Sequence, residues 1–282
     1  MYKIGLSTTG SKESRELFKS YKDAGVSCFE ISASYEETNK MDFYQIRQWA
    51  DECNVEIWSL HLPFYPFDVL DISKKELADF SVRYLSDLII RASKAGICRF
   101  IIHASGEPID ENDRKDRMEC AKNSLFTLAE VAKSVGGIIL VEDLPRTCLG
   151  RNSSDILELL SAHENLYACF DTNHLLSEDN LEFIKKVGSK IKSLHVSDYD
   201  MVNERHWMCG EGKNDWQGIL SELKNVGYDG PWLYEIDPKC PKTIIRDREI
   251  TPEDLVRNAK EAFENKEFTL FSKPKENLGY WD

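Results

Sequence analysis

The chain has 282 residues, of which 41% are hydrophobic and 30% are charged, as is usual for a globular protein with a sizeable core. Its net charge of −13 disfavours a nucleic-acid partner, because affinity for DNA comes mainly from Lys and Arg side chains that neutralise phosphates. No run approaches the roughly 20 apolar residues of a membrane span, and the start MYKIGLSTTG lacks the apolar segment of a signal peptide. We therefore expect small ligands rather than a nucleic acid or a membrane.

The predicted elements alternate between short apolar strands and longer amphipathic helices. In chain order they are strand 3–8, helix 14–24, strand 28–32, strand 55–63, helix 74–95, strand 99–105, helix 114–135, strand 137–144, helix 153–164, strand 167–174, strand 191–198, strand 231–237 and helix 251–266. Gly25, Gly96 and Gly136 follow the first three helices, and Thr251 with Pro252 begins the last one, as expected at helix ends.

This alternation predicts an α/β fold with a parallel sheet, and its eight strands predict closure into a (β/α)8 TIM barrel. An open, doubly wound sheet is the alternative that the pattern leaves. No linker rich in Pro, Gly or Ser divides residues 1–282, so we expect one domain. Residues 267–282 are predicted to be a polar C-terminal extension whose aromatic side chains pack on the barrel or on another subunit.

Eight cysteines form no CxxC pair and lie within or beside apolar runs such as VSCFEIS and YACFDTN. Free cysteine is commonly a small buried hydrophobe. The cysteines therefore predict free thiols, a reducing compartment and a cytoplasmic protein.

Four consecutive predicted strands end in side chains that bind metals: Glu142, Asp171, His195 and Glu235. Active sites of such barrels lie at the C-terminal ends of the strands, so these four side chains are predicted to meet. Three carboxylates would repel one another there, and a divalent cation removes that repulsion. The set suits Mn, Mg or Co, with Zn as a further option. The simpler interpretation, a polar strand end bonded to a loop, suits one such residue better than four.

Five of the six histidines are predicted at the same mouth. They are His61 and His103 near two strand ends, His174 and His206 in loops, and His195 itself. The sixth, His163, ends a predicted helix and is expected on the surface.

Other catalytic motifs are absent. In CGEGKND the lysine lacks the following Ser or Thr of a phosphate-binding P-loop, and neither a GxSxG nor a dinucleotide-binding motif is present. We expect Gly210 and Gly212 of this segment to form a turn that lets the backbone approach the pocket.

The ordered motifs VEDLP, FDTNH, LHVSD, RHWMCGEGKNDW and YEI resemble those of the xylose isomerase-like barrel superfamily over about residues 3–265. That superfamily holds sugar (phosphate) isomerases and epimerases together with endonuclease IV. The resemblance implies one divalent metal on the four strand-end residues, Glu142 and Glu235 as general acid and base, and His174 in contact with substrate oxygens. Asp143 departs from the pattern, because many relatives have Asn there.

The resemblance also implies alternatives. Endonuclease IV holds three zinc ions, and the candidates for its additional ligands here are His61, His103, His174, His206 and Glu204, the last where that family has Asp. The acidic balance of the chain favours a sugar over DNA. A dehydratase of the inosose type could use the same metal and both glutamates. A non-catalytic barrel that binds a sugar or a partner protein is the fourth possibility.

We therefore predict a metal-dependent isomerase or epimerase of a sugar or sugar phosphate, acting by proton transfer through a metal-stabilised enediolate. Predicted substrate contacts are His61, His103, His174, His206, Arg205 and Trp58. Phe64, Trp207 and Trp232 are further candidates for stacking on a sugar, with ordinary packing as the alternative. A homo-oligomer is compatible with the sequence, which does not fix the assembly.

Overall fold

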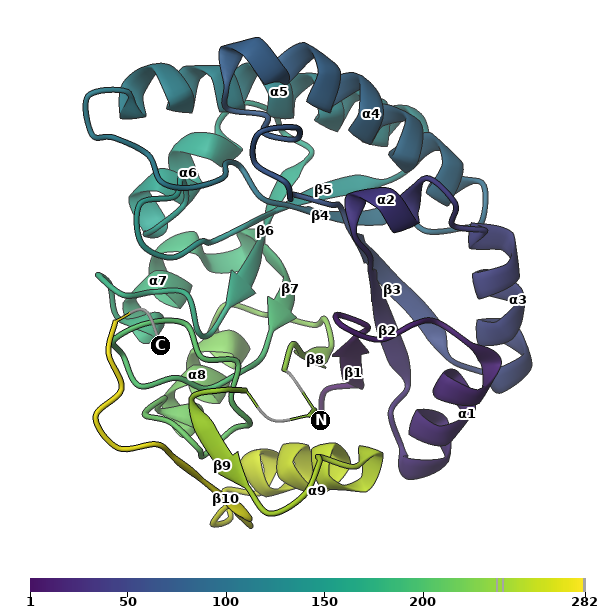
Figure 1. Cartoon of the computed structure of the whole chain (residues 1–282), viewed down its shortest axis with the longest axis vertical. Coiled ribbons are helices and arrows are strands. Elements are labelled where there is room, and N and C mark those ends of the chain that lie inside the picture. Colours follow the sequence, from purple (N-terminus) through teal and green to yellow (C-terminus); the bar gives the residue numbers. More distant parts are fainter. Residues whose placement is uncertain (237, 240, 281–282) are drawn as a thin grey trace.

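The computed structural model describes residues 1–236, 238–239 and 241–280. Eight parallel strands lie at its centre: β1 Ile4–Ser7, β2 Cys28–Ser32, β3 Glu56–His61, β4 Arg99–Ile102, β5 Ile138–Glu142, β6 Leu166–Asp171, β7 Ile191–His195 and β8 Trp232–Tyr234. They follow one another in sequence order around the sheet, with β8 beside β1. A parallel bridge between Val196 and Tyr234 joins β7 to β8 (Figure 1). This closure confirms the predicted barrel and excludes the open sheet.

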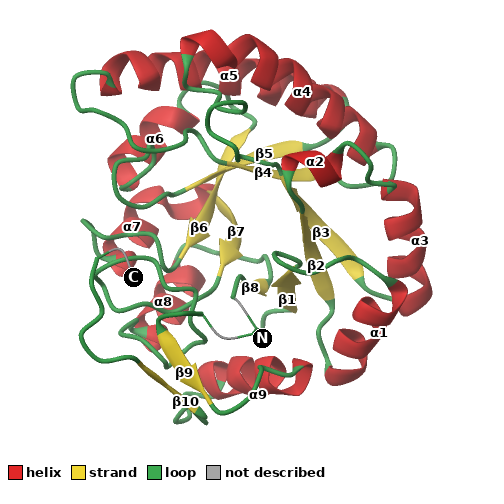
Figure 2. Ribbon diagram, viewed as in Figure 1, coloured by secondary structure: helices red, strands yellow, loops and turns green. Residues whose placement is uncertain are grey.

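Helices surround the strands (Figure 2). The main ones are α1 Arg15–Ala24, α3 Phe43–Cys53, α4 Lys75–Ser93, α5 Arg114–Ser134, α6 Ser153–Leu160, α7 Asn180–Val187, α8 Trp216–Asn225 and α9 Pro252–Phe263. The short α2 Tyr35–Thr38 and the 3₁₀ turn η1 Gly188–Lys190 complete them. The sequence predicted five of these helices and missed α3, α7 and α8. None of the helices in the described residues is long and apolar enough to cross a lipid bilayer.

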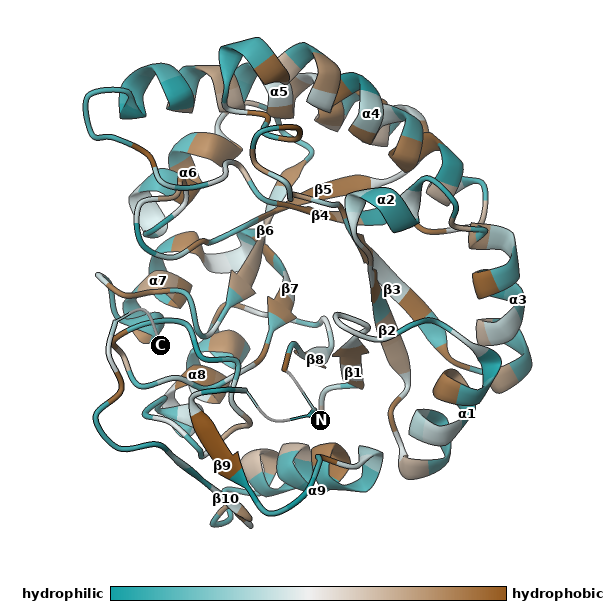
Figure 3. Cartoon of the chain, viewed as in Figure 1, coloured by the Kyte–Doolittle hydropathy of each residue, from teal (hydrophilic) through white to brown (hydrophobic). Residues whose placement is uncertain are grey.

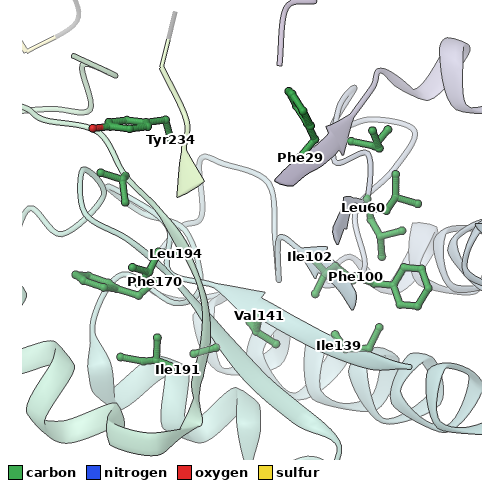
Figure 4. Close-up of a cluster of buried hydrophobic side chains, with 14 of the residues drawn as sticks. Phe29, Leu60, Phe100, Ile102, Ile139, Val141, Phe170, Ile191, Leu194 and Tyr234 are labelled. Carbon is green, nitrogen blue, oxygen red and sulfur yellow. The ribbon is translucent and has the colours of Figure 1, made fainter. Parts of the chain in front are cut away.

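Alternate residues of each strand face opposite sides, and this separates two cores. One set points outward to the helices: the Phe29 ring lies 4.8 Å from that of Phe18 on α1, and Phe170 lies 5.1 Å from Phe183 on α7. Figure 4 shows part of this cluster, and Figure 3 shows the apolar β4 and β5 inside the more polar helices. The other set fills the barrel, where Ile101, Leu140 and Cys169 form a separate apolar cluster.

The C-terminal extension packs on its own barrel. Its strand β10 Ser272–Pro274 pairs antiparallel with β9 Ile244–Arg246, and Phe268 packs on the core. The yellow trace in Figure 1 then runs from β10 back along the barrel, and the Tyr280 carbonyl accepts a hydrogen bond from the Asn203 side chain. Residues 281–282 of the predicted extension, and Asp237 at the end of the last predicted strand, lie outside the described residues. The seven described cysteines are free, as predicted.

The GEG turn lies against two other segments of the chain. Gly210 has φ 89°, and a Cβ there would collide with the ring of Phe268 in the extension. A Cβ on Gly212 would collide with the backbone oxygen of Tyr199 and with the Asp198 side chain. The predicted turn is present, and its glycines let the extension and the loop after β7 approach it closely.

Candidate metal centre at the barrel mouth

The structure brings the four predicted ligands together. Glu142, Asp171 and His195 are the last residues of β5, β6 and β7, and Glu235 is the first residue beyond β8 rather than its end. Ligand atoms of all four lie within 4.8 Å of one another. His195 Nδ1 is 2.9 Å from Glu142 Oε1, 3.3 Å from Glu235 Oε2 and 3.8 Å from Asp171 Oδ2. One imidazole nitrogen therefore faces three carboxylates.

Burial makes this arrangement costly without a cation. The side chains of Asp171 and His195 are fully buried, and Glu142 and Glu235 are almost as well covered. Asp171 Oδ1 accepts a 2.6 Å hydrogen bond from the Asn173 backbone, but Asp171 Oδ2 makes no hydrogen bond within the described residues. Buried carboxylate oxygens normally have partners. Three carboxylates, one imidazole and an unpartnered oxygen among them fit a bound Mn, Mg or Co ion.

Protons on the histidines balance the carboxylates when no cation is present. Burial acts to raise the pKa of Glu142, but His195 and His103 outweigh it and hold that pKa well below its usual value. Burial acts to lower the pKa of His61, but Glu142 raises it to about 9. Burial raises the pKa of Asp171 to about 7, partly opposed by His174. A cation would displace such protons, because its ligands bind deprotonated.

A second group of ligand atoms shares Glu142. His61 Nε2 lies 3.0 Å and His103 Nε2 3.1 Å from Glu142 Oε2, the oxygen that does not face His195. The ring of Phe64, from the loop after β3, stacks on His103 at 3.9 Å between centroids. His61, His103 and Glu142 could also hold a metal ion.

A third group lies in the loops after β6 and β7. His174 Nε2 is 3.3 Å from Glu204 Oε2, and His206 completes a set that could bind a metal. Burial acts to raise the pKa of Glu204, but the neighbouring side chains of His174, His206 and Arg146 hold that pKa well below its usual value. Asn173 positions the loop, because its Oδ1 accepts hydrogen bonds from the backbone N–H groups of Arg205 and His206 at 2.7 and 3.3 Å.

The sequence that carries these residues matches a known protein family. A model of the xylose isomerase-like TIM barrel family matches residues 18–265. The chain belongs to this family. The family match spans every strand from β2 to β8 and all the residues of the three ligand groups.

Relatives of this xylose isomerase-like barrel include sugar epimerases. Fructoselysine 3-epimerase of Escherichia coli O157:H7 is 25% identical over 145 residues, which cover 46% of this chain and 53% of that enzyme. The uncharacterised protein MJ1311 of Methanocaldococcus jannaschii is 26% identical over 219 residues, covering 74% of this chain and 73% of that protein.

Solved structures share the fold. A D-tagatose 3-epimerase-like protein superposes with a TM-score of 0.76 at 22% identity, covering 94% of this chain and 98% of that chain. D-psicose 3-epimerase from Clostridium cellulolyticum H10, crystallised with D-tagatose, has a TM-score of 0.75 at 18% identity and covers 93% and 97% of the two chains. At these identities the likeness supports the fold alone.

Two predicted substrate contacts lie elsewhere in this xylose isomerase-like barrel. Arg205 is buried, and its guanidinium donates 2.9 Å hydrogen bonds to Asp200 and to the backbone carbonyl of Gly279. Arg205 thus contacts the C-terminal extension. The indole of Trp58 donates to Ser193, two residues before His195, and stacks under Arg99 at the start of β4. The structure therefore does not bring Arg205 or Trp58 into the ligand groups.

Of the remaining aromatic candidates, some lie at the ligand groups and others pack elsewhere. Trp207 donates to Thr243, and Trp232 packs on Trp216 and Phe263 outside the barrel, so both are packing residues. Phe64 alone of the aromatic candidates touches the histidines. His163 lies away from the mouth as predicted, but its side chain is mostly covered by Glu130 and Phe126.

Asp143 supports two neighbours of the centre. Its Oδ1 accepts a 2.7 Å hydrogen bond from the Asp171 backbone, and its carbonyl oxygen lies 2.8 Å from His174 Nδ1. Burial raises the pKa of Asp143 well above its usual value. The departure at Asp143 therefore keeps hydrogen-bonding atoms beside both Asp171 and His174.

Sequence reasoning missed Glu30. This side chain is fully buried inside the barrel, and its Oε1 lies 2.9 Å from His195 Nε2. The signal was present, because Glu30 is a lone acid within the apolar strand CFEIS. In that strand Phe29 and Ile31 belong to the outer core, so the alternation turns Glu30 inward.

Proposed function

We propose that this protein is a divalent-metal-dependent isomerase or epimerase of a sugar or sugar phosphate. The observation that carries the proposal is the buried group of Glu142, Asp171, His195 and Glu235, with an unpartnered oxygen on Asp171. The substrate class is supported by fructoselysine 3-epimerase among the relatives of the chain. We propose Mn, Mg or Co as the ion.

Glu142 and Glu235 are the proposed acid–base pair. Glu142 is the last residue of β5 and Glu235 the first residue after β8, and each approaches His195 Nδ1. One carboxylate would remove the proton from the carbon beside the substrate carbonyl, and the other would return a proton to it. When bound, the cation would polarise the carbonyl and stabilise negative charge on its oxygen.

Histidines of the other two groups are the proposed substrate contacts. His61, His103, His174 and His206 place imidazole nitrogens beside Glu142, Glu204 and Glu235, where they can hydrogen bond to hydroxyls or to a phosphate. Phe64 is 37% exposed beside His103 and offers an apolar surface for one face of a sugar.

The test is proton exchange in deuterated water. Ketoses, aldoses, inososes and their phosphates are incubated with the protein and Mn²⁺, and deuterium at carbon is followed by NMR. We expect exchange into at least one compound and its loss on chelation. Loss of water from an inosose would instead indicate the dehydratase. No exchange and no product with any compound would contradict the enzyme and leave a binding barrel.

The second candidate is a zinc-dependent nuclease of the endonuclease IV type. The observation that favours it is that the three groups described above adjoin, because Glu142 is common to two of them and lies 3.7 Å from His174 of the third. The net charge of −13 opposes it, because duplex binding needs several cationic contacts to phosphates. Incision of a duplex with an abasic site at about 0.15 M salt, abolished by Glu142→Gln, would establish this activity.

A further inference from the structure

We propose that Glu30 is a positioning residue that fixes the ring and the tautomer of His195 and so sets the affinity of the centre for its cation. This inference rests on the proposed metal centre. It concerns a residue one layer beneath the ligands rather than a ligand itself.

Glu30 is held in place from β3. Its partner across the β2–β3 ladder is Ser59, whose hydroxyl donates a 2.7 Å hydrogen bond to Glu30 Oε2. Both side chains are fully buried. The second carboxylate oxygen, Oε1, reaches across the barrel to His195 Nε2 on β7, at 2.9 Å. Neither Glu30 Oε1 nor His195 Nε2 makes a hydrogen bond within the described residues. Their 2.9 Å approach is therefore a close contact between two buried polar atoms that both lack a hydrogen-bond partner.

The two nitrogens of His195 have separate tasks. Nε2 faces Glu30, whereas Nδ1 faces the three carboxylates of the proposed centre. A neutral imidazole carries one proton, and a cation needs the nitrogen without it. If the proton were on Nδ1, it would hydrogen bond to Glu142 or Glu235 and occupy the metal-binding position. A carboxylate at Nε2 accepts only, so Glu30 keeps the proton on Nε2 and leaves the Nδ1 lone pair for the ion.

Glu30 also restricts rotation of the His195 ring. A histidine ring at a strand end can turn about its χ2 torsion unless both of its edges are held. With Glu30 at one edge, the ring plane of His195 is set before a cation arrives. Carboxylates that orient a ligating histidine in this way commonly contribute about 10- to 100-fold to metal affinity.

The matched control is Ser193. It lies on the same strand two residues before His195, is also fully buried, and accepts a 3.2 Å hydrogen bond from Trp58 Nε1. Ser193→Ala thus removes a buried polar group from β7 without touching Glu30 or the proposed ligands. A general disturbance of the barrel would affect both variants alike.

The experiment measures Mn²⁺ binding to the metal-free protein by calorimetry, for the wild type, Glu30→Gln and Ser193→Ala. In Glu30→Gln the amide can turn its NH₂ group toward Nε2, which favours the proton on Nδ1. We expect Glu30→Gln to weaken Mn²⁺ binding about 10- to 100-fold and Ser193→Ala to leave it unchanged. Nitrogen-15 NMR of labelled histidine in the metal-free protein, recorded at a pH high enough for the His195 ring to be neutral, should show the proton on Nε2 in the wild type, with Nδ1 protonation appearing in Glu30→Gln.

Equal Mn²⁺ affinity in the wild type and Glu30→Gln would overturn the role of Glu30 while leaving the metal centre intact. No Mn²⁺ binding by the wild type would overturn the metal centre, and this role with it. If Glu30→Gln does not fold, Ser59→Ala replaces it, because it keeps the carboxylate and removes only its orienting donor. A smaller loss of affinity in Ser59→Ala would support the proposal, and an unchanged affinity would reduce Glu30 to a structural residue.

Discussion

Two layers of the same barrel interior differ completely in chemistry. The lower layer contains Ile101, Leu140 and Cys169, which form a closed apolar cluster. The residue two positions further along each of these strands is His103, Glu142 or Asp171. The backbone geometry is the same in both layers, because every second residue of a strand faces the same side. The side chains alone therefore distinguish a packed layer from the layer of proposed metal ligands at the barrel mouth, called the ligand layer below.

The two layers should respond differently to substitution. The apolar layer stabilises the fold by removing hydrocarbon from water. The ligand layer buries carboxylates that repel one another and that a cation would stabilise. Changes in the lower layer should therefore reduce stability, and changes in the upper layer should reduce metal binding and activity.

The largest expected effect is that of Glu142→Gln in the upper layer. The amide cannot take up a proton as a carboxylate does, and it is a weaker metal ligand. We expect proton exchange into the substrate to fall by at least about 10²- to 10⁴-fold, the usual contribution of a general acid or base. Deuterium incorporation and metal content are measured on the same sample. Exchange at the wild-type rate would remove Glu142 from the mechanism.

Leu140→Ala changes the same strand one layer below. Leu140 is fully buried in the interior cluster, so its truncation leaves a cavity. We expect the free energy of unfolding to fall by about 2–5 kcal/mol, with Mn²⁺ affinity unchanged. Urea unfolding and calorimetric Mn²⁺ titration check the two parts. Loss of metal binding without loss of stability would show that the two layers are not separate.

The barrel and the residues of the ligand layer could be predicted from the sequence because both depend on short local patterns of residues. Apolar runs mark the strands, and Glu142, Asp171 and His195 close three of them. What it could not predict depends on contacts between distant segments. The helices α7 and α8 are an exception, because Asp179 and Asp215 cap their N-termini and these local signals were missed.

Side-chain partners were also beyond the sequence. Arg205 looked available to a substrate, but the extension brings the Gly279 carbonyl to it from 74 residues away. The strand position of Trp58 did not reveal that its indole lies beside Ser193 of β7, beneath the ligands. Glu30 was missed as a lone acid in an apolar strand, and only closure of the barrel shows that it meets His195.

The pH dependence of stability offers a milder test of the upper layer. The pKa of His61 is raised from its ordinary value of 6.5 to about 9. Between these two pH values the folded protein without metal keeps a proton on His61 that the unfolded chain has released. The pKa values of His174 and His195 are raised in the same direction against the effect of burial. A folded state that binds more protons loses stability as pH rises.

We therefore expect the metal-free protein to lose stability between about pH 7 and about pH 9, by up to about 1.4 kcal/mol per pH unit for each proton released. Saturating Mn²⁺ should remove this loss, because ligands in the complex are already deprotonated. Urea midpoints with chelator and with Mn²⁺ give the comparison. A metal-free protein that gains stability over this range would show that the histidines are not protonated as inferred.

The smallest expected effect is that of Phe64→Ala. The ring stacks on His103 at the edge of the ligand layer and is partly exposed. Its loss should weaken substrate binding by about 0.5–1.5 kcal/mol, mainly as a higher KM with kcat little changed. Steady-state kinetics on the compound identified by exchange provide the measurement, and Phe80→Ala on the outer face of α4 serves as control. A large fall in kcat with KM unchanged would instead place Phe64 in the chemical step.

The metal content of the purified protein tests the central claim most directly. Elemental analysis after mild purification and equilibration with Mn²⁺ is compared for the wild type and Asp171→Asn, which alters the ligand whose Oδ2 has no hydrogen-bond partner in the described structure. The proposed centre predicts one ion of Mn, Mg or Co per wild-type chain and a clear loss in the variant. Absence of a bound ion in the wild type would contradict the metal centre, and three tightly held zinc ions per chain would contradict the single-metal sugar isomerase or epimerase and favour the nuclease.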